Sequence, residues 1–291
     1  MRPRAASNVA FHKLSHLVIA ATDDASPVRE HDMDDLIDTG PADAPARLIL
    51  AHGAGAAMTS PFMETMAGML AERGIAVTRF EFKYMASRRK TGKRRPAPRA
   101  DSLGPEYVAV VDAVRQAMPA GQVLLIGGKS MGGRVASLVA DELFATQRIN
   151  GLVCLGYPFH PPGMPEQLRT AHLVDLKTPA LIVQGERDPF GSRAEVEAMA
   201  LSSAIWMNWA GDGDHDLGPR GGKGFTRRGN LEAAADAVAA YAAAVTIEQA
   251  YALAGAGSAS GSRCGSSQTA SKVAVAAIAR IWNRRSKPQP W

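Results

Sequence analysis

A short apolar run that stops at a glycine-flanked serine constrains the fold of this chain more than any other stretch. Residues 123–126 are all apolar, Gly128, Ser130 and Gly132 follow at alternate positions, and apolar residues then recur at helical spacing over 135–144. This order predicts a strand, a sharp turn and a helix. It is the pattern of a nucleophile elbow, in which a strained turn lifts a serine hydroxyl above a sheet and glycines let strand and helix pack closely.

The rest of the chain supplies the context that this three-residue pattern needs, since 28 glycines can produce it by chance. Apolar runs and helical periodicity alternate from residue 47 to residue 245. The expected strands are 47–51, 75–82, 123–126, 150–156, 179–184 and 204–209, and the expected helices are 61–73, 108–118, 135–144, 192–201 and 231–245. This alternation predicts an α/β fold, with a mostly parallel sheet covered by helices on both faces in a three-layer sandwich.

The same pattern divides the chain into three parts. Residues 1–31 are expected to be an N-terminal tail or irregular lead-in, residues 32–245 the α/β domain, and residues 246–291 a basic tail rich in Gly, Ser and Ala. A short edge strand is expected before residue 46. Within the domain, residues 83–99 are too rich in charge and proline for a core element and are expected to form a surface loop, and residues 157–177 an excursion over the site.

Composition narrows the classes of protein that remain. With 291 residues, 46% of them hydrophobic, the chain can bury a substantial core. No apolar run approaches the roughly 20 residues of a membrane span. Cys154 and Cys264 do not suggest a disulfide framework or a zinc site. We therefore expect a cytoplasmic protein with no membrane partner and no metal; the oligomeric state is not indicated.

The net charge of +5 is unevenly distributed. Residues 1–22, 83–99 and 263–291 contain basic residues and no acid, so the remainder of the chain is acidic. The stretch 83–99 therefore has three interpretations: solvated surface, a loop that overhangs the site and favours an anionic substrate, or a phosphate-binding surface. Because Tyr84 is its only aromatic residue, nucleic acid is the least favoured partner.

Three side chains needed for nucleophilic catalysis follow three different expected strands. Ser130 follows 123–126, Asp188 follows 179–184, and His215 follows 204–209. The order Ser, Asp, His is the one that accompanies a nucleophile elbow: the imidazole takes the serine proton, and the carboxylate fixes the imidazole tautomer. Asp188 could instead cap a helix, in which case the acid would be one of Asp212, Asp214 and Asp216.

A glycine-rich turn follows the first expected strand and brings a fourth element to the same edge of the sheet. Backbone N–H groups of Ala54 in this turn and of Met131 after the serine are the expected oxyanion donors. Four further residues are expected near the substrate: His52, Gly53, Lys129 and His160. The side chain of His52 is expected to be structural.

Together, five segments resemble a known superfamily. They are Leu-Ala-His-Gly-Ala-Gly at 50–55, Phe-Lys-Tyr-Met at 82–85 with the basic stretch to 99, Gly-Gly-Lys-Ser-Met-Gly-Gly-Arg at 127–134, Gln-Gly-Glu-Arg-Asp-Pro-Phe-Gly at 184–191, and Gly-Asp-Gly-Asp-His at 211–215. Residues 32–245 resemble the α/β-hydrolase superfamily, and within it a small dienelactone-hydrolase-like family. That family is similar to the hydrolase-like domain of an animal chromatin-complex subunit, whose role need not be enzymatic.

The residues and the resemblance point to one activity and one alternative. We expect a serine hydrolase that cleaves a carboxylic ester, thioester or related acyl bond of a small to medium substrate through an acyl-enzyme, with no cofactor. The alternative is a non-catalytic α/β-hydrolase-like module that binds protein or nucleic acid through residues 83–99.

Overall fold

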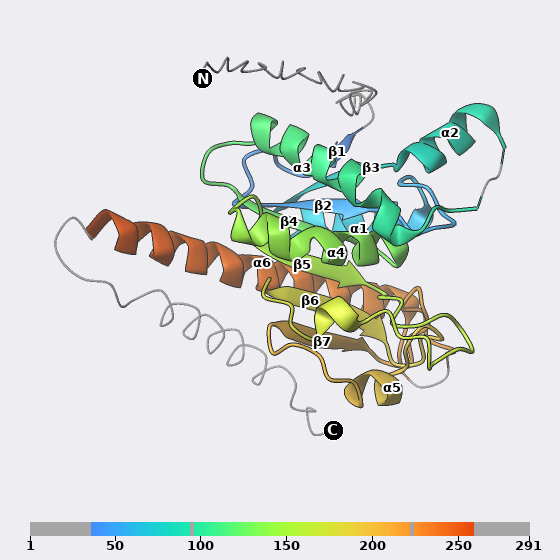
Figure 1. Ribbon diagram of the computed structural model, residues 1–291. Coiled ribbons are helices and arrows are strands. Elements are labelled where there is room, and N and C mark those ends of the chain that lie inside the picture. Colours follow the sequence, from blue (N-terminus) through green and yellow to red (C-terminus); the bar gives the residue numbers. More distant parts are fainter. Residues whose placement is uncertain (1–35, 94–95, 222–223, 259–291) are drawn as a thin grey trace, which may run out of the picture. The chain divides into compact units, whose positions relative to one another are not determined.

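The computed structural model describes residues 36–93, 96–221 and 224–258 (Figure 1). The expected tail 1–31, Cys264 and the part of the expected basic tail beyond residue 258 lie outside these ranges. The described residues contain one sheet with the strand order β1-β3-β2-β4-β5-β6-β7. Its strands are β1 (Ile37–Thr39), β2 (Ala46–Ala51), β3 (Ile75–Phe80), β4 (Val123–Lys129), β5 (Gly151–Leu155), β6 (Ala180–Gly185) and β7 (Ile205–Ala210).

The sheet is parallel except at one edge. β1 pairs antiparallel with β3, and all other neighbouring strands pair in parallel. The expected mostly parallel sheet and the expected short edge strand are therefore confirmed. Because parallel strands are joined by crossovers, their carboxyl ends lie at one edge, where ligands bind in folds of this kind.

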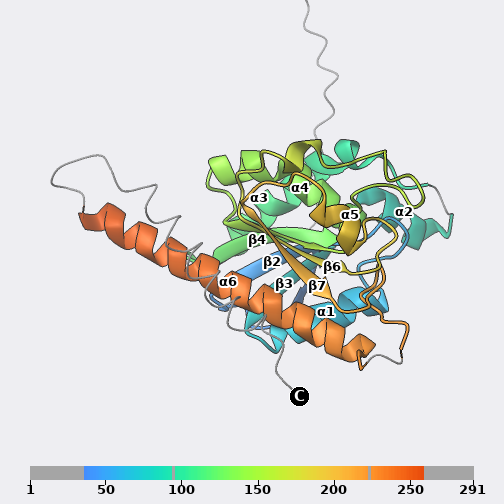
Figure 2. The same ribbon diagram turned by 90° about the horizontal axis from the view of Figure 1, so that it is seen from below.

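Helices cover both faces of the sheet, as Figure 2 shows most clearly. They are α1 (Pro61–Ala71), α2 (Lys83–Thr91), α3 (Gly104–Ala117), α4 (Met131–Ala145), α5 (Arg193–Glu197) and α6 (Arg227–Ser258), with 3₁₀ turns at Ala100–Leu103 and Ala171–Leu173. Alternate residues of a strand point to opposite faces. In β4, Leu124 and Ile126 pack in the core with α3 and α4, whereas Val123 and Leu125 pack in the core with α1 and α6. The expected three-layer arrangement is confirmed.

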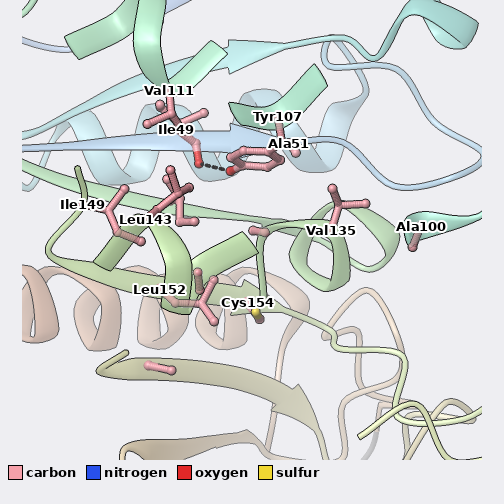
Figure 3. Close-up of a cluster of buried hydrophobic side chains, with 14 of the residues drawn as sticks. Ile49, Ala51, Ala100, Tyr107, Val111, Val135, Leu143, Ile149, Leu152 and Cys154 are labelled. Carbon is pink, nitrogen blue, oxygen red and sulfur yellow. Dashed lines mark hydrogen bonds between the residues drawn. The ribbon is translucent and has the colours of Figure 1, made fainter. Parts of the chain in front are cut away.

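One buried tyrosine ties β2 to β4 inside the first of these cores. The Tyr107 hydroxyl of α3 lies 3.1 Å from the Ile49 carbonyl oxygen of β2 and accepts the Gly127 N–H of β4 at 2.9 Å. Figure 3 draws the contact between Tyr107 and Ile49 as a dashed line. A side chain at Gly127 would be impossible, since its Cβ would lie 1.9 Å from the Val153 carbonyl oxygen of β5. Close contact between these three strands sets the position of the turns that leave β2 and β4.

The basic stretch departs from its expected structure. Residues 83–91 form α2, so the prediction of a loop was wrong there. High charge excludes a core helix, but a surface helix needs only a small buried face, which Met85 supplies. The helix ends where Gly92 adopts the left-handed conformation, with φ of 71°.

Other elements differ from expectation in length. β4 continues to Lys129 because Gly127, Gly128 and Lys129 pair with β5. α5 covers only Arg193–Glu197 of the expected helix 192–201. α6 begins at Arg227 and ends at Ser258, so it passes the expected domain limit at 245; alanine, which has the highest helix propensity, is its most frequent residue.

α6 is also long and apolar enough, by length and composition, to cross a membrane. Much of its first half packs instead against α1 and the sheet, through Leu231, Ala234, Ala235, Val238, Tyr241, Ala242 and Val245. Of its most apolar window of 18 residues, 33% is buried inside the fold, and length and composition alone do not show a membrane span.

Candidate functional site

Ser130 lies in a strained turn between β4 and α4. Its φ of 52° and ψ of −116° are unusual for a residue with a side chain, and such a conformation persists only where the surroundings enforce it. The backbone N–H of Ser130 donates to the Leu155 carbonyl of β5 at 2.9 Å, and its carbonyl accepts from Arg134 one helical turn later. This is the backbone geometry of a nucleophile elbow.

The flanking glycines are required by close backbone contacts. A Cβ at Gly128 would lie 2.5 Å from the backbone of Gly132, and one at Gly132 would lie 2.6 Å from the carbonyl oxygens of Ala51 and His52. The Gly-x-Ser-x-Gly pattern therefore allows β4 and α4 to approach each other and the end of β2.

His215 and Asp188 come together from two different loops. Nδ1 of His215 donates to Oδ2 of Asp188 at 2.8 Å, and the Asp188 side chain is fully buried. This bond leaves Nε2 of the neutral ring as an acceptor. The Phe190 ring packs on the imidazole with 4.3 Å between ring centroids.

Gln184 of β6 supports the same carboxylate, and sequence reasoning missed it. Its Nε2 donates to Asp188 Oδ2 at 3.0 Å, its Oε1 accepts the Tyr157 N–H at 2.7 Å, and the Phe190 N–H donates to Asp188 Oδ1 at 2.9 Å. The available signal was an amide side chain at the end of the apolar run 180–183.

The three competing acids of the loop 211–219 have other contacts. Asp212 pairs with Arg220 and Arg187, and hydrogen bonds from Arg220 hold its pKa well below the usual range. Asp214 accepts the N–H groups of Asp216 and Gly218, while Asp216 pairs with Lys129. None of these acids hydrogen-bonds the His215 ring within the part of the chain that the structure describes.

Ser130 and His215 both lie beside the end of β5. The Leu155 carbonyl accepts from Ser130, and a Cβ on the next residue, Gly156, would lie 3.4 Å from Cε1 of His215. Across the described residues, the Ser130 hydroxyl makes no hydrogen bond. Bonds between nucleophile and base are often loose without a substrate and tighten in the complex.

The turn after β2 lies against Ser130. A Cβ at Gly53 would be 3.7 Å from Cβ of Ser130. The carbonyls of Ala54 and Gly55 accept from Tyr84 and Arg88 of α2, at 3.1 and 3.4 Å. No acceptor for the Ala54 N–H occurs among the described residues, and Met131, the first residue of α4, has no intrahelical acceptor for its N–H.

His52 holds this turn with its side chain, as expected. The fully buried ring donates from Nδ1 to the Gly53 carbonyl at 2.6 Å and accepts the Phe82 N–H at Nε2 at 3.2 Å. Burial lowers its pKa, and both contacts require the neutral ring. His52 therefore fixes backbone rather than offering a group to a ligand.

Lys129 and His160 were expected near the substrate, and both are largely buried. Nζ of Lys129 lies 3.2 Å from Asp216 Oδ1 and 5.4 Å from the centroid of the Phe62 ring. Burial lowers the pKa of Lys129, and the nearby Asp216 carboxylate partly opposes this shift. His160 donates from Nδ1 to the Pro161 carbonyl at 2.8 Å, and its Nε2 is 3.6 Å from Glu195 Oε2. The described contacts of His160 do not connect it to Ser130.

Residues 36–93, 96–221 and 224–258 contain no group of three or more His, Cys, Asp or Glu side chains arranged to hold a metal ion. Cys154 is buried beneath the elbow, where its Sγ contacts the Gly133 carbonyl at 3.5 Å, and burial raises its pKa. The chemistry available at the carboxyl edge is that of hydroxyl, imidazole, carboxylate and backbone N–H.

Comparison with known proteins agrees with this fold. A family model described as an alpha/beta hydrolase domain matches residues 44–243.

Three solved structures share the fold. An alpha-beta serine hydrolase homologue from Coxiella burnetii has a TM-score of 0.52 at 19% identity, over 69% of this chain and 88% of that chain. A dienelactone hydrolase from Anabaena variabilis has a TM-score of 0.52 at 20% identity, over 70% and 88%. Est1E from Butyrivibrio proteoclasticus has a TM-score of 0.51 at 15% identity, over 69% and 91%.

Proposed function

This chain belongs to the alpha/beta hydrolase domain family through residues 44–243, and on that premise we propose that it is a serine hydrolase. Its substrate is a carboxylic ester, thioester or related acyl compound of small to medium size. The observation that carries this proposal is the bond between His215 and the buried Asp188 at the edge where Ser130 is held in a strained turn.

Each group has a role in two successive acyl transfers. Nε2 of His215 takes the Ser130 proton as Oγ attacks the acyl carbon, and returns it to the leaving alcohol or thiol when that bond breaks. Water, deprotonated by the same nitrogen, then cleaves the acyl-enzyme and releases the acid. Asp188 stabilises the imidazolium form of His215, and the N–H groups of Ala54 and Met131 bind the oxyanion of each tetrahedral intermediate.

Labelling with a fluorophosphonate probe tests this proposal. The purified chain should gain one phosphonyl adduct, detected by intact mass, because the probe reacts with an activated serine. Ser130→Ala should abolish the adduct, whereas Ser137→Ala, a change at a buried serine of α4, should keep it. A folded parent protein that stays unlabelled would contradict the proposal. Labelling would justify a screen of p-nitrophenyl esters of increasing acyl length.

A second candidate function is the non-catalytic module that binds protein or nucleic acid through residues 83–99, and the exposed lysines of the surface helix α2 favour it. Lys83, Lys90 and Lys93 are exposed on α2 and just after it. Retention on heparin across a salt series, compared with a variant carrying Gln at these three positions, tests the idea. Equal retention of the two proteins would remove its support. If retention is equal but the variant loses preference for carboxylate-bearing esters, the charge serves an anionic acyl substrate instead.

A further inference from the structure

A lysine buried directly before the candidate nucleophile has no place in the mechanism above. The side chain of Lys129 is 8% exposed, and removing an ammonium group from water is costly unless a partner compensates for it. Its partner is Asp216, at 3.2 Å between Nζ and Oδ1. Lys129 immediately precedes Ser130, and Asp216 immediately follows His215. The ion pair thus joins the end of β4, next to the proposed nucleophile, to the loop that carries the proposed base.

The contacts around Gly156 show how closely these groups approach. A Cβ placed on Gly156 would lie 3.1 Å from Nζ of Lys129, 3.4 Å from Cε1 of His215 and 2.7 Å from the His215 carbonyl oxygen. Gly156 itself has φ of 62°, which suits glycine. The Lys129 ammonium and the His215 ring therefore pack on the same backbone atoms at the end of β5.

Asp216 is held on its other side by its own loop. Its N–H donates to Oδ1 of Asp214 at 2.9 Å, and the same oxygen accepts the Gly218 N–H at 2.8 Å. The bond to Lys129 connects this tight loop to β4, the strand that carries Ser130. By contrast, the bond to Asp188 restrains the His215 ring and ties it to the loop after β6.

We propose that the ion pair between Lys129 and Asp216 is a positioning device that holds His215 against Ser130. In this role Lys129 and Asp216 act through the loop that carries the imidazole. The inference rests on the proposed function, because the distance it controls matters only if His215 serves Ser130. Misplacement by about 1 Å can reduce a reaction rate by about 100-fold.

The kinetics of fluorophosphonate labelling test this proposal without a known substrate. Asp216→Asn, a change at a half-exposed side chain, should lower the maximal labelling rate at least tenfold and leave the half-saturating probe concentration within about twofold. Lys129→Met should have a similar effect. Asp236→Asn, which breaks the surface ion pair with Arg73, is the matched control and should label like the parent.

A double-mutant cycle separates coupling from two independent losses. If the pair acts as one device, the double variant Lys129→Met/Asp216→Asn should label no more slowly than either single variant. The double variant also guards against misfolding, because removing Asp216 alone leaves the buried Lys129 ammonium without its partner. Losses that multiply in the double variant would overturn the proposal.

The outcomes also distinguish this inference from the proposed function. A parent protein that is never labelled contradicts the serine hydrolase itself. A parent that is labelled at Ser130, together with an Asp216→Asn variant that labels at the parental rate, overturns only the positioning role.

Discussion

At the scale of single residues, the candidate site depends on one fully buried carboxylate. Asp188 accepts hydrogen bonds from His215, Gln184 and Phe190. Several donors to one carboxylate stabilise its charged form, and the charge in turn selects the His215 tautomer with the proton on Nδ1. The proposed base is therefore oriented before any ligand binds.

Replacement of Asp188 by Asn tests whether this carboxylate selects the His215 tautomer. An amide can donate to Nδ1 and so favour the wrong tautomer, and we expect the labelling rate of Ser130 to fall about 10³- to 10⁴-fold. Asp214→Asn, at a neighbouring acid that does not contact the ring, should reduce the rate far less. Comparable losses in the two variants would show that loop integrity, rather than the carboxylate on His215, controls reactivity.

At the scale of elements, the turn between β4 and α4 depends on close backbone packing. The glycines at 128 and 132 leave no room for a methyl group against β2 and α4. α2 contributes in a different way, because its Tyr84 and Arg88 hold the carbonyls of the turn after β2. A basic surface helix thus helps to shape the proposed oxyanion site.

Gly132→Ala is expected to damage this turn. The new methyl group would lie 2.6 Å from two backbone carbonyl oxygens, so the free energy of unfolding should fall by about 1–3 kcal/mol or more. Gly68→Ala in α1 is the matched control: its Cβ meets no atom within 4 Å, and helix propensity predicts a gain of about 0.5–1 kcal/mol. Urea denaturation of both variants measures the difference, and equal effects would refute the packing argument.

At the scale of the whole molecule, the parallel sheet brings distant segments to one edge. The turn after β2, the elbow after β4, the loop after β6 and the loop after β7 all leave the carboxyl ends of their strands. The fold can therefore bring together residues that are as far apart in the sequence as His52 and His215. Its stability also depends on groups that must stay neutral inside it.

His52 makes that stability depend on pH. Burial lowers its pKa below 6.5 in the folded protein, so its contribution is complete above pH 6.5 and is lost as the pH falls toward the folded-state pKa, because the unfolded chain binds the proton first. The free energy of unfolding should therefore decline as the pH falls below about 6.5. In His52→Gln the decline should be smaller, as urea denaturation at pH 7.5, 6.5 and 5.5 would show. An unchanged slope would contradict the assignment of a neutral buried ring.

The sequence by itself determined the fold class, the alternation of strands and helices, and the strand, turn and helix around Ser130. These follow from hydrophobic periodicity and from glycines beside a single serine, which are local properties of the chain. The local sequence pattern did not predict α2. High charge shows that a segment is not a core element, but such a segment can still form a surface helix with one buried methionine.

Only the tertiary structure decided which partners the polar groups acquire. Four acids were available to His215, and the structure places Asp188 on Nδ1, Asp212 between two arginines and Asp216 on Lys129. The tertiary structure likewise places the Gln184 amide against Asp188. Hydrogen bonds and ion pairs between distant segments depend on the register and twist of the sheet, which bring particular side chains within about 3 Å of each other. That distance cannot be derived from the spacing of the residues along the chain.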